Sequence, residues 1–208
     1  MTSAIDHLVV TARSRDEGIA WLADLLGVAP VMGGEHARMG THNALVRLGD
    51  AAYLEVIAPN PRAPRPDRPR WFDLDRLPPA AAPRLATWVV RASDIDAAVA
   101  AAALPLGPIE AMTRGALEWR ITIPPDGGLV LDGAAPSLIQ WAGHEHPAAA
   151  LPDQGCRLEG LTIRHPRADR LAAMLRDIGF DGPLTLSPST EDWALGAAIH
   201  TPAGVCVL

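Results

Sequence analysis

Two side chains in the first third of the sequence could do chemistry together: His7 and Glu55. Glu55 lies in the apolar run 52–58, which reads as a strand whose two faces are both mostly apolar. A carboxylate on such a covered face needs an arginine, a histidine or a metal ion as its partner. His7 lies in the β-branched run 5–11 and could serve as a metal ligand or a general base. The structural alternatives are a hydrogen-bonded strand histidine and an ion pair of Glu55 with Arg47 across the hairpin.

The elements that must position these residues recur along the chain. A strand, a helix and three strands are predicted at 1–58, again at 85–143 and a third time at 157–208. A connector rich in proline and arginine at 59–84 and a linker at 144–156 separate the units. The pattern predicts an α+β fold of three βαβββ units.

Local signals set the limits of the first helix and qualify the linkers. Ser14 and Glu17 form a capping-box pattern at its start, and Gly27 follows its last apolar residue. Gly33-Gly34 reads as a turn. The linker sequence His144-Glu145-His146 reads as an exposed loop and not as a metal cluster, because adjacent residues of an extended chain point apart.

Composition narrows the classes of function. The formal net charge is −6 and all basic residues are arginine, so nucleic acid is not an expected partner. No apolar run approaches the roughly 20 residues that span a bilayer, and the N-terminus lacks the pattern of a signal peptide. Cys156 and Cys206 lack metal-ligand spacing and are expected as reduced thiols in a cytoplasmic protein.

Four stretches resemble the vicinal oxygen chelate superfamily, and within it the glyoxalase-like domain family. They are IDHLVV at 5–10, GTHNALVRLGDAAYLEVI at 40–57, WVVRASDIDAAVAAA at 88–102 and GLTIRHP at 160–166. The resemblance covers nearly the whole chain. It implies that the three βαβββ units form one glyoxalase-like body of curved mixed sheets, with helices on the outer face. It also implies that an open curved sheet encloses a cleft, with metal ligands on the first and last strands of paired units.

The resemblance also implies a ligand set. His7 matches the first-strand ligand and Glu55 the last-strand ligand of the first unit, while Gln140 matches the last strand of the second unit. Thr87 stands where the second unit should supply its other ligand, so one expected ligand is missing. Mixed nitrogen and oxygen ligation suits one zinc, nickel, iron or manganese ion. The other expectation is a cleft without a metal.

Further residues are expected at the cleft. Glu55 and His42 are the candidates for catalysis, with a capping role at the strand as the alternative for His42. Arg47 could bind a substrate carboxylate as a bidentate fork or form a structural ion pair. The candidates for substrate contact are Arg47, Asn43, Trp71, Phe72 and Trp88. Trp71 and Phe72 are too apolar for a solvated connector, so we expect them to pack down, where they could close over a ligand.

The sequence thus predicts a protein that binds a small organic molecule. It would act as a metal-dependent lyase, isomerase or dioxygenase on vicinal oxygens, with the metal as Lewis acid. The alternative is a metal-free protein that binds or sequesters such molecules in the same cleft. A third possibility is a structural role in which the extra unit supports a homodimer. Whether the cleft is open or is filled by the chain's own side chains distinguishes this last possibility from the other two.

Overall fold

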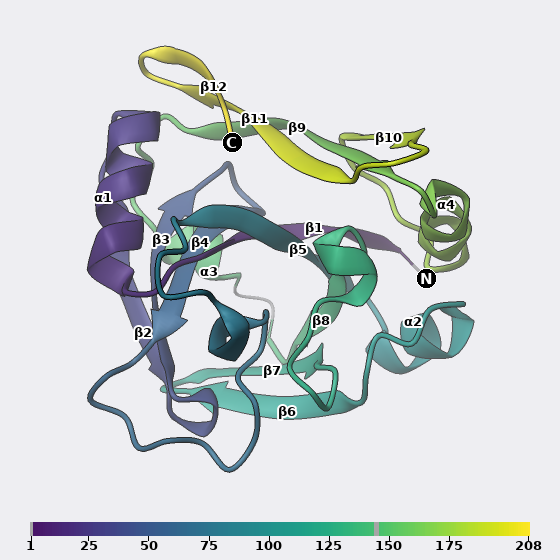
Figure 1. The fold of residues 1–208 in the computed structure, drawn as a ribbon, viewed down its shortest axis with the longest axis horizontal. Coiled ribbons are helices and arrows are strands. Elements are labelled where there is room, and N and C mark those ends of the chain that lie inside the picture. The colour runs from purple at the N-terminus through teal and green to yellow at the C-terminus, as the bar shows by residue number, and fades with distance from the viewer. Residues whose placement is uncertain (1, 144–145) are drawn as a thin grey trace.

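The computed structural model describes residues 2–143 and 146–208, and the order strand, helix, three strands occurs in it three times (Figure 1). The first set is β1 (Ser3–Thr11), α1 (Arg15–Leu26), β2 (Val31–His36), β3 (Thr41–Arg47) and β4 (Tyr53–Pro59). The second set is β5 (Arg84–Ala92), α2 (Ile95–Ala101), β6 (Ile109–Arg114), β7 (Leu117–Thr122) and β8 (Ser137–Trp141). The third set is β9 (Arg157–His165), α4 (Ala168–Asp177), β10 (Leu184–Pro188), β11 (Ala194–Thr201) and β12 (Gly204–Val207). The short helices are η1 (Ala37–Met39), η2 (Leu74–Arg76), η3 (Val130–Gly133) and α3 (Pro147–Ala150).

The first two sets share one sheet of eight strands in the order β2-β3-β4-β1-β5-β8-β7-β6. Its centre is the antiparallel pair β1–β5, and each of these strands has a parallel neighbour, β4 and β8. The sheet curves strongly, so that its two ends approach each other (Figure 1). Arg38 next to β2 donates to the carbonyl of Ala111 on β6 at 3.0 Å and pairs with Glu110. The predicted fold class, curved mixed sheets of βαβββ units, is confirmed.

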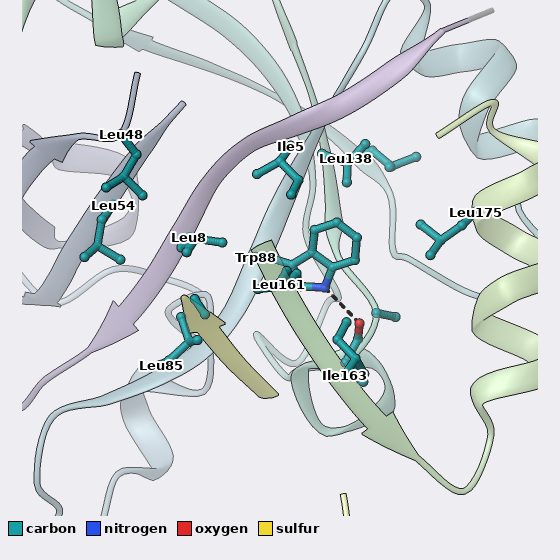
Figure 2. Packing of buried hydrophobic residues seen from close by; sticks show 14 of the residues in the cluster. Ile5, Leu8, Leu48, Leu54, Leu85, Trp88, Leu138, Leu161, Ile163 and Leu175 are labelled. Atoms are coloured by element: carbon teal, nitrogen blue, oxygen red, sulfur yellow. Dashed lines mark hydrogen bonds between the residues drawn. The ribbon is translucent and has the colours of Figure 1, made fainter. Parts of the chain in front are cut away.

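The third set forms a separate sheet, β10-β9-β11-β12, which packs over the outer face of the central strands (Figures 1 and 2). Leu161 and Ile163 of β9 join Leu8 of β1 and Trp88 of β5 in one buried cluster. Trp88 is fully buried there, and its Nε1 donates to the carbonyl of Ala134 at 2.9 Å (Figure 2). This placement contradicts the expectation that Trp88 contacts a substrate, because Trp88 faces the outer core and not the inside of the curved sheet.

A second core fills the inside of the curved sheet. Val9, Val89 and Ile139 of the central strands meet Trp71 and Phe72 of the connector in this cluster. The connector therefore folds back over the concave face, and both aromatic side chains are buried. The concave face is thus lined by the chain itself, and any cleft lies under the connector.

Local chemistry explains the elements near the site. Ser14 accepts a hydrogen bond from the backbone N–H of Glu17 at 3.2 Å, and Gly27 ends α1 in the left-handed region at φ 69°, as the capping pattern predicts. Gly33 and Gly34 differ from the prediction, because they belong to β2 and not to a turn. The register of β2 against β3 shifts between Met32 and Glu35, which marks an irregularity at these glycines. The predicted unit boundaries, with the connector at 59–84 and the linker at 144–156, stay a prediction.

Among the residues that the structure describes, no helix is both long and apolar enough to cross a bilayer.

Candidate functional site

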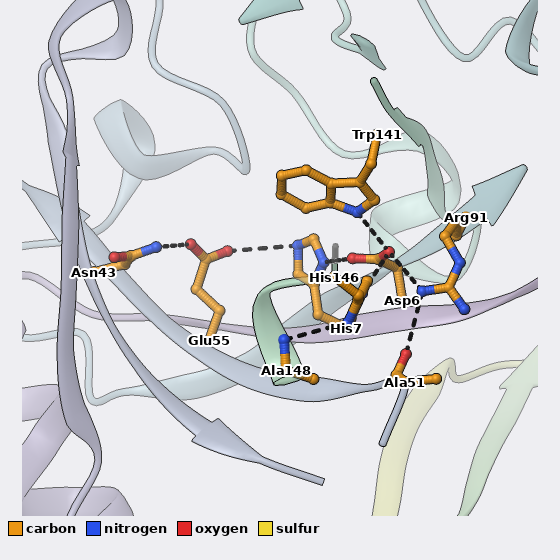
Figure 3. A network of polar contacts seen from close by, with 9 residues as sticks. All are labelled: Asp6, His7, Asn43, Ala51, Glu55, Arg91, Trp141, His146 and Ala148. Atoms are coloured by element: carbon orange, nitrogen blue, oxygen red, sulfur yellow. Dashed lines mark hydrogen bonds and ion pairs between the residues drawn. The ribbon is translucent and has the colours of Figure 1, made fainter. Parts of the chain in front are cut away.

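The site begins with an irregularity in β1. In the pairing with β5, Ile5 lies opposite Val90 and His7 opposite Val89, so Asp6 is an extra residue. Such a bulge lets two neighbouring residues turn to one side of a strand. Asp6 and His7 consequently contact each other, with His7 Nδ1 2.7 Å from Asp6 Oδ1 (Figure 3).

Asp6 is a fully buried carboxylate held by a network of donors. Its Oδ2 accepts from Trp141 Nε1 at 3.0 Å and from His146 Nε2 at 2.9 Å, while Arg91 lies 3.6 Å away (Figure 3). Burial alone would raise the pKa of Asp6, but hydrogen bonds from His146 and His7 and the charges of these rings lower it well below its usual range. Asp6 is therefore a carboxylate at neutral pH, and it accepts from every partner.

This carboxylate sets the tautomer of His7. Because Asp6 only accepts, Nδ1 of His7 carries the proton, and Nε2 of a neutral ring has a free lone pair. That Nε2 faces Glu55 Oε2 at 3.6 Å (Figure 3). Tyr53 stacks on the His7 ring with centroids 4.5 Å apart, which fixes the ring plane. The structure brings His7 and Glu55 together, as the sequence predicts. Asp6 is a further partner of His7.

Glu55 is oriented from its other side. Asn43 Nδ2 donates to Glu55 Oε1 at 2.6 Å, and Asn43 Oδ1 accepts from the backbone N–H of Gly34 at 2.7 Å. A Cβ on Gly33 would lie 2.0 Å from Asn43 Oδ1, so glycine is required there for Asn43 to reach this position. The amide of Asn43 leaves Glu55 Oε2 free and directed at His7.

A small pocket lies against this pair. Its volume is about 30 Å³, close to the space of one water molecule. The lining consists of the pair, its neighbours and a ring of aromatic and aliphatic side chains: His7, His36, Asn43, Leu45, Tyr53, Glu55, Trp71, Phe72, Arg114, Trp119, Ile121, Ile139 and Trp141. The rings of Trp71 and Phe72 are stacked with their centroids 5.4 Å apart, and they close the pocket. The chain's own side chains therefore almost fill the cleft.

Three other candidates lie elsewhere. Gln140 accepts from the backbone N–H of Ile95 at 3.1 Å and donates to the carbonyl of Ser93 at 3.1 Å, so it holds the start of α2. Ile139 occupies the pocket face of β8 instead, because a register difference of one residue moves a side chain to the opposite face of a sheet. The expectation that Gln140 joins His7 and Glu55 is therefore corrected.

His42 and Arg47 also lie away from the pair. His42 neighbours Asn43 on β3 and so faces the opposite side, at a surface groove rich in arginine. Burial and then the charge of Arg15 lower the pKa of His42, and both of its ring nitrogens lack partners among the described residues. Arg47 pairs with Asp50 at 2.7 Å, the structural role that was the alternative to carboxylate binding.

The donor set can be tested against the divalent metal that the resemblance implies. His7 Nε2 and Glu55 Oε2 are suitable donors, and the Asp6 carboxylate behind His7 is the usual outer partner of a ligating histidine. Val89 and Ile139, however, occupy the central strands of the second set on this face. Within residues 2–143 and 146–208 no group of three or more His, Cys, Asp or Glu side chains could hold a metal ion. Catalytic zinc sites use three protein ligands, so the described side chains do not fit a resident metal ion.

Sequence reasoning missed Asp6 and His146. Regular strand alternation points Asp6 away from His7, so the sequence alone does not predict their contact. His146 lies in the linker that the sequence predicts as an exposed loop, yet its ring packs on Tyr53 and Trp141, with ring centroids 5.6 Å and 6.1 Å away. His144 and Glu145 lie outside the described residues. A polar residue directly before His7 in an otherwise apolar strand was the one local signal available.

One family model and several solved structures are similar to this chain. The family model described as "Glyoxalase-like domain" matches residues 5–179. A hypothetical protein from Staphylococcus aureus superposes with a TM-score of 0.59 at 13% identity, over 100% of this chain and 84% of that chain. Methylmalonyl-CoA epimerase in complex with methylmalonyl-CoA and NH4+ gives a TM-score of 0.49 at 17% identity, over 71% of this chain and 100% of that chain. Methylmalonyl-CoA epimerase from Mycobacterium tuberculosis gives a TM-score of 0.43 at 20% identity, over 66% of this chain and 85% of that chain. No curated protein matches the chain in sequence.

Proposed function

Because the chain belongs to the glyoxalase-like domain family of the vicinal oxygen chelate superfamily, we propose that it binds a small organic molecule over His7 and Glu55 and moves a proton on it. The reaction class is that of a lyase or isomerase acting beside an oxygen substituent. The observation that carries the proposal is the His7–Glu55 pair, which lies 3.6 Å apart at a pocket inside the curved sheet.

Each member of the pair has a support that suits acid–base chemistry. Asp6 keeps the proton of His7 on Nδ1 and would stabilise the imidazolium if Nε2 takes a second proton. Asn43 holds Oε1 of Glu55, so the free Oε2 lies on the substrate side. Two facing acceptors could take a proton from a bound molecule on one side and return it on the other, which is what transfer of a proton between a carbon and an oxygen requires.

Substrate entry requires a movement of the connector. A pocket of about 30 Å³ admits no organic molecule, and Trp71 and Phe72 form its cover. Phe72 and Asp73 both adopt positive φ angles of 57°, a backbone conformation that costs energy in residues other than glycine. Displacement of this turn would relieve that conformation and open the pocket between the connector and the sheet.

A protein that binds without reaction is the second candidate. Val89 and Ile139 make the β5–β8 side of the site aliphatic, and Trp119 and Trp141 add aromatic walls. Such walls suit sequestration of an apolar ring. A sequestering protein would bind the same molecules and leave their C–H bonds intact.

A metal-dependent version of the reaction, with zinc, nickel, iron or manganese, remains a proposal tested by metal content. It needs donors beyond the two that the described chain brings together. The cytoplasmic location and the absence of nucleic acid or membrane partners also stay proposals, supported by the composition of the chain alone. The homodimer stays a proposal that comes from the extra third unit in the sequence.

Binding is tested by titrating small oxygen-bearing compounds while tryptophan fluorescence is recorded, since Trp71, Trp119 and Trp141 line the pocket. We expect saturable quenching in the wild type and weaker quenching in Trp71→Phe, which removes the reporter on the cover. Trp193→Phe, in the third set, is the matched control and should leave the ligand-induced change intact. Quenching that is equal in wild type and Trp71→Phe but lost in Trp193→Phe would place the ligand elsewhere and contradict the proposal.

A further inference from the structure

Arg114, at the end of β6, sends its side chain to the same pocket as Glu55. Its NH1 lies 3.2 Å from His36 Nε2, and its guanidinium carbon lies 6.0 Å from the centre of the Trp119 ring. Its stem packs on Gly34, where an added Cβ would come within 2.4 Å of Arg114 Cδ. Three neighbours on two strands, β2 and β7, therefore hold this cation in place.

His36 accepts from Arg114 as a neutral ring. Burial and then the charge of Arg114 lower the pKa of His36 to about 3. Arginine has only donors, so Nε2 of His36 is the acceptor and Nδ1 carries the proton that faces Thr41 Oγ1 at 3.1 Å. The contact fixes the direction of the guanidinium without neutralising its charge.

The neighbouring arginines differ from Arg114 because they form ion pairs with a carboxylate. Arg38 and Arg68 both pair with Glu110, the Arg68 contact at 2.8 Å. For Arg114, the described residues include no carboxylate within ion-pair distance. A half-buried charge without a counterion is costly, so its retention points to a partner that comes from outside the chain.

A second unused donor belongs to the same pocket. Trp71 is buried, and its Nε1 has no hydrogen-bond partner among the described residues. Its ring lines the pocket together with Arg114. The pocket is thus lined by a cation without a carboxylate partner and by the ring of Trp71, whose N–H has no acceptor among the described residues, together with the acid–base pair.

We propose that Arg114 binds the carboxylate of the substrate, which makes the substrate class a small carboxylic acid with a second oxygen on the neighbouring carbon. This inference rests on the proposed function and names its substrate class. The planar guanidinium matches a carboxylate in bidentate fashion, and the Trp71 N–H suits the second oxygen. A single arginine opposite the Glu55 carboxylate favours a singly charged group over a phosphate. His36 is a positioning residue for Arg114.

The experiment compares carboxylic acids with their amides of equal shape by isothermal titration calorimetry. The probes are lactate with lactamide, mandelate with mandelamide and benzoate with benzamide. In the wild type we expect each acid that binds to bind about tenfold or more tightly than its amide, since a hydrogen-bonded charge contributes about 1.5–3 kcal/mol, which corresponds to that ratio. Arg114→Gln should abolish the preference. Arg164→Gln, an exposed arginine on β9, changes the net charge equally and should retain it.

Two outcomes would overturn the inference. One is equal affinity for acids and amides in the wild type, or no binding of any acid. The other is a preference for acids that survives in Arg114→Gln. Binding of the amides alone, with weaker fluorescence quenching in Trp71→Phe than in the wild type, would reject the carboxylate and leave the proposed function intact. If Arg114→Gln fails to fold, Arg114→Lys serves instead: it keeps the charge but loses the planar fork, and should retain only part of the preference.

Discussion

Acidification from pH 7 to pH 5 should destabilise this protein through His36. The ring is buried and neutral in the folded chain, where its pKa is lowered from 6.5 to about 3. The unfolded chain instead takes up a proton as the pH falls below 6.5. The unfolded state therefore binds more protons between these two values, and the free energy of unfolding falls as the pH falls.

The magnitude follows from the two pKa values. Between pH 6.5 and pH 5 each pH unit contributes about 1.4 kcal/mol, so His36 accounts for a loss of about 2 kcal/mol of unfolding free energy at pH 5. The folded ring stays neutral over this range because the folded pKa lies well below it. A loss of this size is a large share of the stability of an ordinary domain.

The assay is urea unfolding of wild type and His36→Gln at pH 7, 6 and 5. The Gln side chain can still accept from Arg114 but does not titrate. We expect His36→Gln to be less stable at pH 7 and to lose about 2 kcal/mol less than wild type on going to pH 5. Contributions from the remaining titratable groups are common to both proteins and cancel in the difference. Parallel losses in the two proteins would refute the reasoning, as would an NMR titration of wild type in which the His36 ring is protonated by pH 5.

Three further predictions concern the pair and its supports. Gly33→Ala should lower the unfolding free energy by about 2–4 kcal/mol, because its Cβ would displace Asn43, whereas Gly160→Ala, whose Cβ meets nothing closer than 3.7 Å, should be nearly neutral in urea unfolding. Asp6→Asn should cost about 3 kcal/mol at pH 7, because it removes the charge from a buried network. Since the pKa of Asp6 is lowered, the difference should shrink as the pH falls below 3.8, and a constant difference down to pH 2 would contradict this view. Elemental mass spectrometry of untagged protein should find well under one equivalent of transition metal, and a full equivalent that is lost in His7→Ala would show that further donors exist.

Much of the fold could be predicted because the spacing of apolar residues along the chain indicates which side chains are buried. The alternation in β7 and the helical spacing of Leu171, Met174 and Leu175 depend on neighbours along the chain, and the structure buries these three residues in α4. Glu55 was identifiable for the same reason, as a carboxylate in a strand with two apolar faces. These features need no knowledge of which strands meet.

The missed features depend on contacts between distant segments. The bulge that turns Asp6 toward His7 arises from the pairing of β1 with β5, which a single strand does not reveal. The choice of Ile139 over Gln140 at the pocket depends on a register that can slip by one residue. Arg114 could not be identified as an uncompensated charge until its distance from every carboxylate was known.

The most direct test of the central claim is exchange of the substrate C–H with solvent deuterium. Small 2-hydroxy and 2-oxo acids, and neutral carbonyl compounds that bind in the fluorescence titration, are incubated with protein in D2O and followed by proton NMR. Wild type should catalyse loss of the C–H signal next to the carbonyl or carboxylate, and Glu55→Gln, which keeps the shape of the side chain, should not. Wild type that binds compounds but exchanges none of them, or exchange that is equally fast in Glu55→Gln, would contradict proton transfer by the His7–Glu55 pair.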